Sequence, residues 1–155
     1  MKKLPKLILT DIDGVWTDGG MYYDQTGNEW KCFSTYDGGG VKRAHDNGVP
    51  VGIVTAENTV IVENRAKKLK VDYVFQGVHN KLEYVTCFCE CNGITLSEVA
   101  YIGDDMGDLE LLKAVGISGI PLGAYIIDRL TPSYVTKKQG GKGAFRDFVD
   151  WIFER

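Results

Sequence analysis

The stretch Leu7-Ile8-Leu9-Thr10-Asp11-Ile12-Asp13-Gly14 decides the fold. Its first four residues form a short apolar run without alternation, which is typical of a strand covered on both faces of a sheet. Two carboxylates and a glycine follow immediately at the carboxyl end of this run. The segment therefore predicts a buried central strand that ends in a polar, acidic loop.

The rest of the chain repeats the pattern of an apolar run followed by a helical segment. Strands are predicted over residues 49–54, 71–75, 99–102 and 117–120. Helices are predicted over residues 41–47, 58–69, 81–91, 105–115 and 144–153. This alternation predicts an α/β fold with a doubly wound, Rossmann-like parallel sheet. In such sheets ligands bind beyond the carboxyl ends of the strands.

Length and composition indicate one domain over residues 1–155. Hydrophobic residues make up 44% of the chain and charged residues 25%, and the formal net charge is -3. This balance argues against a nucleic-acid or membrane-surface partner. No apolar run approaches the roughly 20 residues of a membrane span, so we expect a cytoplasmic protein.

On a predicted helix Cys89 faces away from Cys87 and Cys91, which favours structural thiols over a shared metal.

Residues 19–33 interrupt the alternation. Aromatic residues flank the turn-forming segment Asp24-Gln25-Thr26-Gly27-Asn28, a pattern that predicts a β-hairpin. The hairpin follows the first strand, so we expect it to stand over the strand ends as a flap. A lone two-stranded hairpin is marginally stable in water, and its aromatic residues predict packing against another subunit.

Polar side chains follow four of the predicted strands at this same edge. They are Asp11 and Asp13, Thr55, Lys81, and Asp104 with Asp105. Clustered carboxylates repel one another and favour a hard divalent cation, of which Mg²⁺ is the usual choice. A phosphate could then lie between the cation, the Thr55 hydroxyl and Lys81. A carboxylate that attacks phosphorus forms an aspartyl-phosphate, and a second carboxylate can transfer the protons.

Each of these residues also has a plainer explanation. The pair Asp11 and Asp13 could form a turn, Thr55 could cap a helix, and Lys81 could be a solvated surface residue. The segment from Gly103 to Asp105 could cap its helix. The joint placement of all of them at one sheet edge favours the catalytic interpretation.

The same residues resemble the four motifs of the haloacid dehalogenase (HAD) superfamily of phosphohydrolases, over nearly the whole chain. The resemblance implies that Asp11 is the nucleophile and Asp13 the general acid and base. It implies that Thr55 and the Ala56 backbone amide bind the phosphate, with Lys81 holding both phosphate and nucleophile. It further implies that Asp11, the Asp13 carbonyl and Asp104 bind Mg²⁺, with Asp105 supporting the water shell of the metal.

The spacing leaves no room for a cap domain, because the stretches before and after Thr55 are filled by predicted elements. The run from Asp13 to Gly19, the hairpin and the tail from Gly140 to Arg146 resemble the capless sugar acid phosphatases of this superfamily. Such enzymes act on 3-deoxy-D-manno-octulosonate (KDO) 8-phosphate or on nonulosonate 9-phosphates such as KDN 9-phosphate. They are homotetramers in which neighbouring subunits complete each other's active sites. The glycine-rich tail is either a turn before the last helix or a substrate contact.

One departure from the octulosonate pattern concerns the substrate. Those enzymes usually place Gly-Arg after the motif threonine, whereas this chain has Ala56-Glu57. A glutamate there resembles the KDN-9-phosphate phosphatases, which implies that Glu57 binds sugar hydroxyls while Arg65 and Lys68 face the sugar carboxylate. The alternative for the two cations is a solvated helix face. We therefore expect a nonulosonate 9-phosphate as substrate, with KDO 8-phosphate as the alternative.

Two non-catalytic classes are weaker alternatives. A signalling receiver domain carries its phosphoacceptor aspartate after the third strand, where this chain reads Phe75-Gln76-Gly77. A catalytically idle assembly domain would not need the intact set Asp11, Asp13, Lys81 and Asp104. His45 and His79 have no visible role and are expected at the surface.

Overall fold

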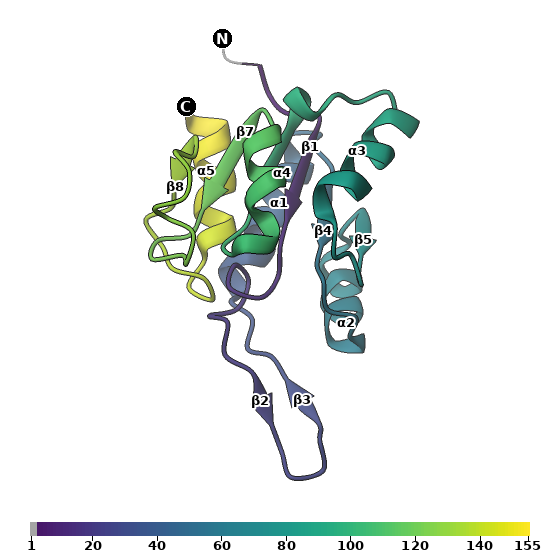
Figure 1. Ribbon diagram of the computed structural model, residues 1–155, viewed down its shortest axis with the longest axis vertical. Helices are drawn as coiled ribbons and strands as arrows, with labels where there is room; N and C mark the ends of the chain where they lie inside the picture. Colours follow the sequence, from purple (N-terminus) through teal and green to yellow (C-terminus); the bar gives the residue numbers. More distant parts are fainter. Residues whose placement is uncertain (1–2) are drawn as a thin grey trace.

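The computed structural model describes residues 3–155. Its main sheet has six parallel strands in the order β5-β4-β1-β6-β7-β8 (Figure 1). Their bounds are β1 Leu7–Thr10, β4 Val51–Val54, β5 Tyr73–Phe75, β6 Val99–Ile102, β7 Ile117–Ile120 and β8 Tyr134–Val135. The predicted fold class is confirmed. The five predicted sheet strands form as β1, β4, β5, β6 and β7, whereas the two-residue strand β8 was not predicted.

The topology directs ligands to the end of β1. After β1 the chain builds β4 and β5 on one side, and then crosses back to build β6 on the other side. Ile8 of β1 is therefore paired with Val51 of β4 and with Ala100 of β6. The strand order reverses at β1, and such switch points open a crevice at the carboxyl ends of the strands.

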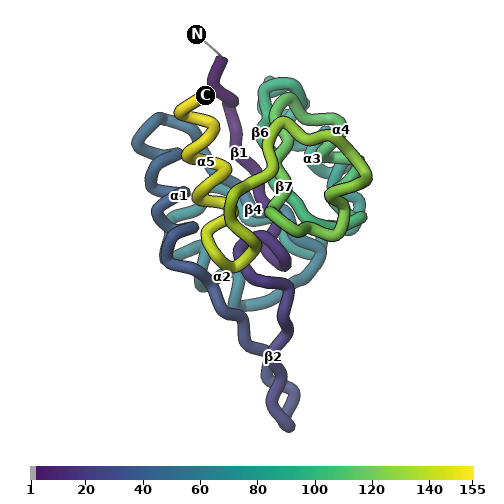
Figure 2. Tube along the Cα trace, turned by 90° about the vertical axis from the view of Figure 1, so that its left-hand side faces the viewer, coloured from purple at the N-terminus to yellow at the C-terminus, as the bar shows by residue number. Residues whose placement is uncertain are grey.

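Helices cover both faces of the sheet. Their bounds are α1 Thr35–Asp46, α2 Val60–Leu69, α3 Lys81–Cys91, α4 Leu109–Ala114 and α5 Ala144–Glu154, with short 3₁₀ turns at Leu96–Glu98 and Met106–Asp108. Helices α1, α2 and α5 pack on one face, and α3 and α4 pack on the other (Figure 2). Alternating residues of β1 divide between the two clusters: Ile8 joins the first, while Leu7 and Leu9 join the second.

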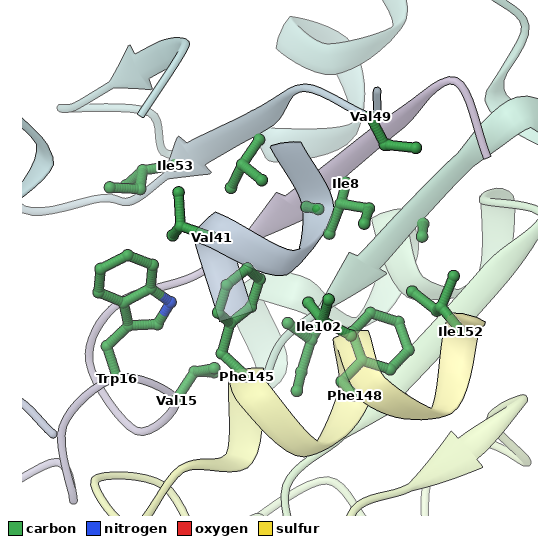
Figure 3. Close-up of a cluster of buried hydrophobic side chains, with 14 of the residues drawn as sticks. Ile8, Val15, Trp16, Val41, Val49, Ile53, Ile102, Phe145, Phe148 and Ile152 are labelled. Carbon is green, nitrogen blue, oxygen red and sulfur yellow. The ribbon is translucent and has the colours of Figure 1, made fainter. Parts of the chain in front are cut away.

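The larger cluster holds α5 against the sheet. Phe145 and Phe148 of α5 lie with Val41 of α1 over Ile8 and Ile102 (Figure 3). All five side chains are buried. Burying a side chain of this size stabilises a fold by roughly 1.5–3 kcal/mol. The cluster therefore holds α1 and α5 firmly against this face of the sheet.

The first helix begins earlier than the sequence predicts. We expected it to start at Val41, but α1 starts at Thr35 and runs through three consecutive glycines. Ser34 caps it by accepting a hydrogen bond from the Tyr36 N–H at 3.2 Å. A side chain at Gly40 would lie only 3.1 Å from the Arg146 backbone. The glycines therefore allow α1 and α5 to approach closely, and this packing outweighs their poor helix propensity.

The predicted hairpin forms, with a narrower paired region than residues 19–33. Strands β2 (Tyr22–Tyr23) and β3 (Glu29–Trp30) pair antiparallel and project away from the body of the molecule (Figures 1 and 2). Asp24 stabilises the turn because its Oδ1 accepts hydrogen bonds from the Thr26 and Asn28 N–H groups. No cap domain interrupts residues 3–155. Within that range, none of the helices has both the length and the apolar character that crossing a bilayer requires.

Candidate active site

Asp11 lies at the end of β1 and is held there by its backbone. Its N–H donates a 3.0 Å hydrogen bond to the Ile102 carbonyl at the end of β6. The chain then turns sharply, and the Thr17 hydroxyl accepts from the N–H of Gly14 at 3.2 Å and of Gly19 at 3.2 Å. Asp11 is consequently fixed at the edge where β1 and β6 end, as its position after the first strand predicts.

Lys81 reaches Asp11 from the start of α3. Its Nζ lies 3.0 Å from Asp11 Oδ1 and 2.6 Å from Asp108 Oδ1. The side chain is buried, which disfavours the charged form, but the ion pairs with Asp11 and Asp108 outweigh that effect and raise the pKa of Lys81. Lys81 is therefore buried and positively charged. Its burial shows that the alternative of a solvated surface residue is wrong.

Asp108 is the residue that holds this arrangement together, and sequence reasoning assigned it no role. Its Oδ1 accepts hydrogen bonds from Lys81 and from the Tyr101 hydroxyl. Its Oδ2 accepts from the backbone N–H of Asp104 at 2.9 Å and of Asp105 at 3.1 Å. The signal in the sequence was the spacing of Asp105 and Asp108, which form a capping box at the 3₁₀ turn after β6.

Three carboxylates gather at this edge. Asp11, Asp104 and Asp108 each offer an oxygen atom, and these atoms all lie within 4.8 Å of one another. The sequence predicted Asp11 and Asp104 in this group but named the Asp13 carbonyl in place of Asp108. The Asp13 contribution stays a prediction.

The electrostatics of the three carboxylates fit a cation. Burial, with the neighbouring Asp11 and Asp108 charges, raises the pKa of Asp104 to about 8. Burial and the Asp108 charge likewise raise the pKa of Asp11 to about 7, against the lowering effect of Lys81. Asp104 Oδ1 is buried and has no hydrogen-bond partner. A divalent cation at this point would satisfy that oxygen and relieve the repulsion.

A cavity of about 330 Å³ opens beside these groups. The predicted residues Asp11, Asp13, Thr55, Ala56, Glu57 and Lys81 all line it. Thr55 is fixed by two backbone bonds, from its N–H to the Phe75 carbonyl at 2.9 Å and from the Val78 N–H to its carbonyl at 3.0 Å. Thr59, and not Thr55, caps α2, so the capping alternative for Thr55 is wrong.

Asp105 and His79 also line the cavity. Asp105 caps the 3₁₀ turn by accepting from the Met106 N–H at 2.7 Å. His79 is exposed, as expected, and it lines the cavity although sequence reasoning assigned it no role. No motif marks His79, since it reaches the cavity only because the loop after β5 lies beside the loop after β4. His45 instead lies 2.8 Å from Asp72 through its Nε2.

Arg65 and Lys68 do not line this cavity. The Arg65 guanidinium lies 5.6 Å from the centre of the Phe33 ring and donates to the Ser34 carbonyl at 3.2 Å. Lys68 is exposed. Both occupy the later turns of α2, away from the end of β4, so their contact with a sugar carboxylate stays a prediction.

Asp13 lies at the rim of the cavity and is paired with the hairpin. Its Oδ1 is 2.6 Å from Nζ of Lys31, which follows β3. Lys31 also lies 3.2 Å from Glu29 Oε1. Burial disfavours the charged amine, but the bonds to Asp13 and Glu29 outweigh it and raise the pKa of Lys31. Sequence reasoning missed Lys31, because no local pattern distinguishes it from other hairpin residues.

The glycine-rich tail supports the loop after β1. The Gly141 N–H donates to the Val15 carbonyl at 3.1 Å, and a side chain at Gly140 would overlap the Gly14 carbonyl. The tail is thus packed against the segment that carries Asp13, while a direct contact with substrate stays a prediction.

The fold and the site together define a class of enzyme. A capless, doubly wound sheet delivers an aspartate after β1, a threonine after β4, a lysine at the start of α3 and a further aspartate after β6. This is the arrangement of the HAD superfamily of phosphohydrolases, in which the carboxylate at the first position attacks phosphorus.

Comparison with known proteins identifies the family. The chain is 37% identical over 152 residues to the 3-deoxy-D-manno-octulosonate 8-phosphate phosphatase KdsC of Haemophilus influenzae, covering 96% of this chain and 83% of the relative. Its structure superimposes on a Moraxella catarrhalis phosphatase of the same name, described in complex with a magnesium ion, a phosphate ion and a KDO molecule. That match has a TM-score of 0.92 and 33% identity, over 97% of this chain and 86% of the other.

A third relative carries the superfamily name. A structure from Legionella pneumophila, described as a putative HAD superfamily (subfamily III A) hydrolase, matches with a TM-score of 0.91 and 32% identity, over 97% of this chain and 82% of the other. No protein-family model matches the chain. The chain belongs to the family of 3-deoxy-D-manno-octulosonate 8-phosphate phosphatases, and it is a phosphomonoester hydrolase of sugar acid phosphates. These relatives favour the octulosonate alternative over the nonulosonate substrate that the sequence led us to expect first.

Proposed function

We propose that this protein hydrolyses 3-deoxy-D-manno-octulosonate 8-phosphate to the free sugar acid and inorganic phosphate, with Mg²⁺ as its cation. The observation that carries the proposal is the two ion pairs that Lys81 forms with Asp11 and Asp108 at the end of β1, beside the buried, unpartnered Asp104 oxygen. The Moraxella catarrhalis relative, which is described with magnesium, phosphate and KDO, supports this choice of cation and substrate.

In the first half of the reaction, Asp11 attacks the phosphorus atom. A bond forms between an Asp11 carboxylate oxygen and phosphorus, and the bond from phosphorus to the sugar oxygen breaks. Asp13 gives its proton to that departing oxygen. In this reaction Lys81, the Thr55 hydroxyl and the Ala56 N–H bind the phosphate oxygens, and a cation held by Asp11 and Asp104 would supply further charge neutralisation.

In the second half, Asp13 acts as a base. It takes a proton from a water molecule, whose oxygen forms a bond to phosphorus while the bond between phosphorus and Asp11 breaks. Inorganic phosphate is released, and Asp11 is again a free carboxylate. Asp108 takes no part in bond making, but it keeps Lys81 beside Asp11 throughout.

A nonulosonate 9-phosphate is the second candidate substrate. The observation that favours it is Glu57, which lines the cavity where octulosonate enzymes usually carry arginine. A carboxylate there suits sugar hydroxyl groups, whereas it would repel a sugar carboxylate.

Steady-state kinetics with both substrates distinguish the two candidates. We expect kcat/KM for KDO 8-phosphate to exceed that for KDN 9-phosphate, and we expect chelation of Mg²⁺ to abolish phosphate release. A higher kcat/KM for KDN 9-phosphate would reverse the order of the two candidates. The variant Glu57→Gln keeps the shape of the side chain and removes its charge, so it tests whether Glu57 sets the preference.

We also propose that the protein is a homotetramer in which a neighbouring subunit covers the active site. Four large side chains on the hairpin are 46–63% exposed: Met21, Tyr22, Tyr23 and Trp30. An apolar surface of this kind on a two-stranded hairpin favours burial against another copy. Sedimentation is expected to give four times the chain mass of 17.2 kDa, and a monomer would refute the shared lid.

The cellular compartment follows from the cysteines. All four, Cys32, Cys87, Cys89 and Cys91, are free thiols. Unpaired thiols, three of them exposed, are typical of a reducing environment, so we infer that the enzyme works in the cytoplasm.

A further inference from the structure

The base of the hairpin is tied to the cavity by a buried lysine. Lys31 follows β3, and its Nζ lies 2.6 Å from Asp13 Oδ1 and 3.2 Å from Glu29 Oε1. The Lys31 side chain is 1% exposed, whereas the Asp13 side chain is 29% exposed. Lysine is almost never buried unless it is paired, so the pairing with Asp13 accounts for the position of Lys31.

Lys31 does not line the cavity, although Asp13 does. With its side chain buried, Lys31 is not placed to contact a substrate in this arrangement. Any effect of Lys31 on the reaction must therefore pass through Asp13.

The contact fixes one of the two Asp13 oxygens. Oδ1 is held by Lys31, which leaves Oδ2 as the oxygen available for proton transfer. Proton transfer requires a donor and an acceptor about 2.6–3.2 Å apart. A side chain anchored through one oxygen keeps the other oxygen in place, whereas an unanchored aspartate rotates among its rotamers.

We propose that Lys31 is a positioning residue for Asp13. Through Lys31, the hairpin holds Asp13 in the orientation that proton transfer requires. This inference rests on the proposed function, in which Asp13 protonates the departing sugar oxygen. Lys31 transfers no proton in either half of the reaction. Glu29 holds the Lys31 ammonium from the hairpin side and so belongs to the same unit.

The dependence of the rate on the leaving group tests this role. A sugar alkoxide needs a proton as it departs, whereas p-nitrophenolate departs without one. The ratio of kcat/KM for KDO 8-phosphate to kcat/KM for p-nitrophenyl phosphate therefore reports the help that Asp13 gives to the leaving group. In Lys31→Met we expect this ratio to fall about tenfold or more, a part of the roughly 10²–10⁴-fold contributed by general acid catalysis.

Four further variants are measured beside Lys31→Met. Asp13→Asn should lower the same ratio at least as much as Lys31→Met, and Glu29→Gln should lower it less. The control Lys42→Met removes a lysine from an exposed ion pair with Asp46 in α1, and it should leave the ratio unchanged. Lys31→Arg should restore most of the ratio. Thermal unfolding identifies a folded variant, and Lys31→Gln replaces Lys31→Met if the latter does not fold.

The outcomes separate this inference from the function on which it rests. Equal losses on both substrates in Lys31→Met, together with a lowered ratio in Asp13→Asn, would overturn the positioning role and leave the function intact. An unchanged ratio in Asp13→Asn would overturn the role given to Asp13, and the inference with it. A wild-type protein that releases phosphate from neither substrate would overturn the proposed function itself.

Discussion

Gly14 and Asp104 lie so close together that the side chain of any other residue at position 14 would overlap the Asp104 carboxylate. The glycine is in the loop after β1, and the aspartate is in the loop after β6. Gly14 also has φ +85, a conformation that residues with a Cβ rarely adopt. The absence of one side chain thus allows the carboxylate after β6 to approach the loop that carries Asp11.

We therefore expect Gly14→Ala to weaken cation binding by displacing Asp104. Apparent Mg²⁺ affinity, measured from the dependence of activity on Mg²⁺ concentration, should fall at least about tenfold, as it does when groups that orient metal ligands are lost. The control is Gly27→Ala in the hairpin turn, at φ +87 with no atom within 4 Å of the added methyl group. It carries the same backbone strain, so an equal loss in both variants would contradict the role of the Asp104 contact.

Asp11→Asn should remove covalent catalysis. The amide is isosteric with the carboxylate but does not attack phosphorus, so turnover should fall at least about 10³-fold. The wild-type protein, quenched in acid during turnover of a labelled substrate, should carry one acid-stable phosphoryl group that the variant lacks. Comparable turnover in the two proteins would reject the aspartyl-phosphate route.

Asp108→Ala should reduce both activity and stability. The substitution leaves the buried Lys81 with Asp11 as its one remaining charged partner, and it removes the acceptor of the Asp104 and Asp105 N–H groups. Breaking a buried pair costs about 3–5 kcal/mol, and we expect the lower end because Asp11 stays in place. Denaturant unfolding and kcat measure the two effects, with exposed Asp46→Ala as the control. A stable variant with normal kcat would show that Asp108 does not hold Lys81.

The buried carboxyl group of Asp37 is expected to make the stability of the protein depend on pH. It is buried in α1, its Oδ1 accepts from the Arg146 N–H at 3.1 Å, and its Oδ2 has no partner. Burial, opposed by that N–H and by the Arg65 charge, raises the pKa of Asp37 to about 7 from its ordinary 3.8. The folded protein thus holds the proton more tightly than the unfolded chain. The resulting stability is complete below about pH 4 and is lost as the pH rises to about 7.

The variant Asp37→Asn isolates this contribution. Between pH 5 and pH 8 the wild-type free energy of unfolding should fall by about 2–3 kcal/mol more than that of the variant. Saturating Mg²⁺ in both samples keeps the raised pKa values of Asp11 and Asp104 from adding to the difference. Parallel stability curves would show that Asp37 ionises in the fold as easily as it does in water.

The elements that sequence reasoning found share one property. Strand β1 and the buried strands β4 and β6 are continuous apolar runs. Such a run can be recognised from residues that are adjacent in the sequence. Helix α1 was placed too late because Gly38, Gly39 and Gly40 disfavour a helix locally. Gly39 and Gly40 allow α1 to pack closely on Arg146 and Phe145 of α5, more than one hundred positions away in the sequence, and Gly38 lies against Leu69 of α2.

By itself, the sequence determined the fold class and the residues that the strands deliver to the candidate site. Asp11, Thr55, Lys81 and Asp104 each follow a strand or open a helix, and parallel strands deliver such residues to one edge. Only the tertiary structure decided which groups hold those residues in place. Asp108 behind Lys81, Lys31 behind Asp13, and Gly14 beneath Asp104 act across distances in sequence that no local pattern records. Arg65 and Lys68 do not line the cavity, since a residue on a helix is placed by the packing of that helix and not by the strand before it.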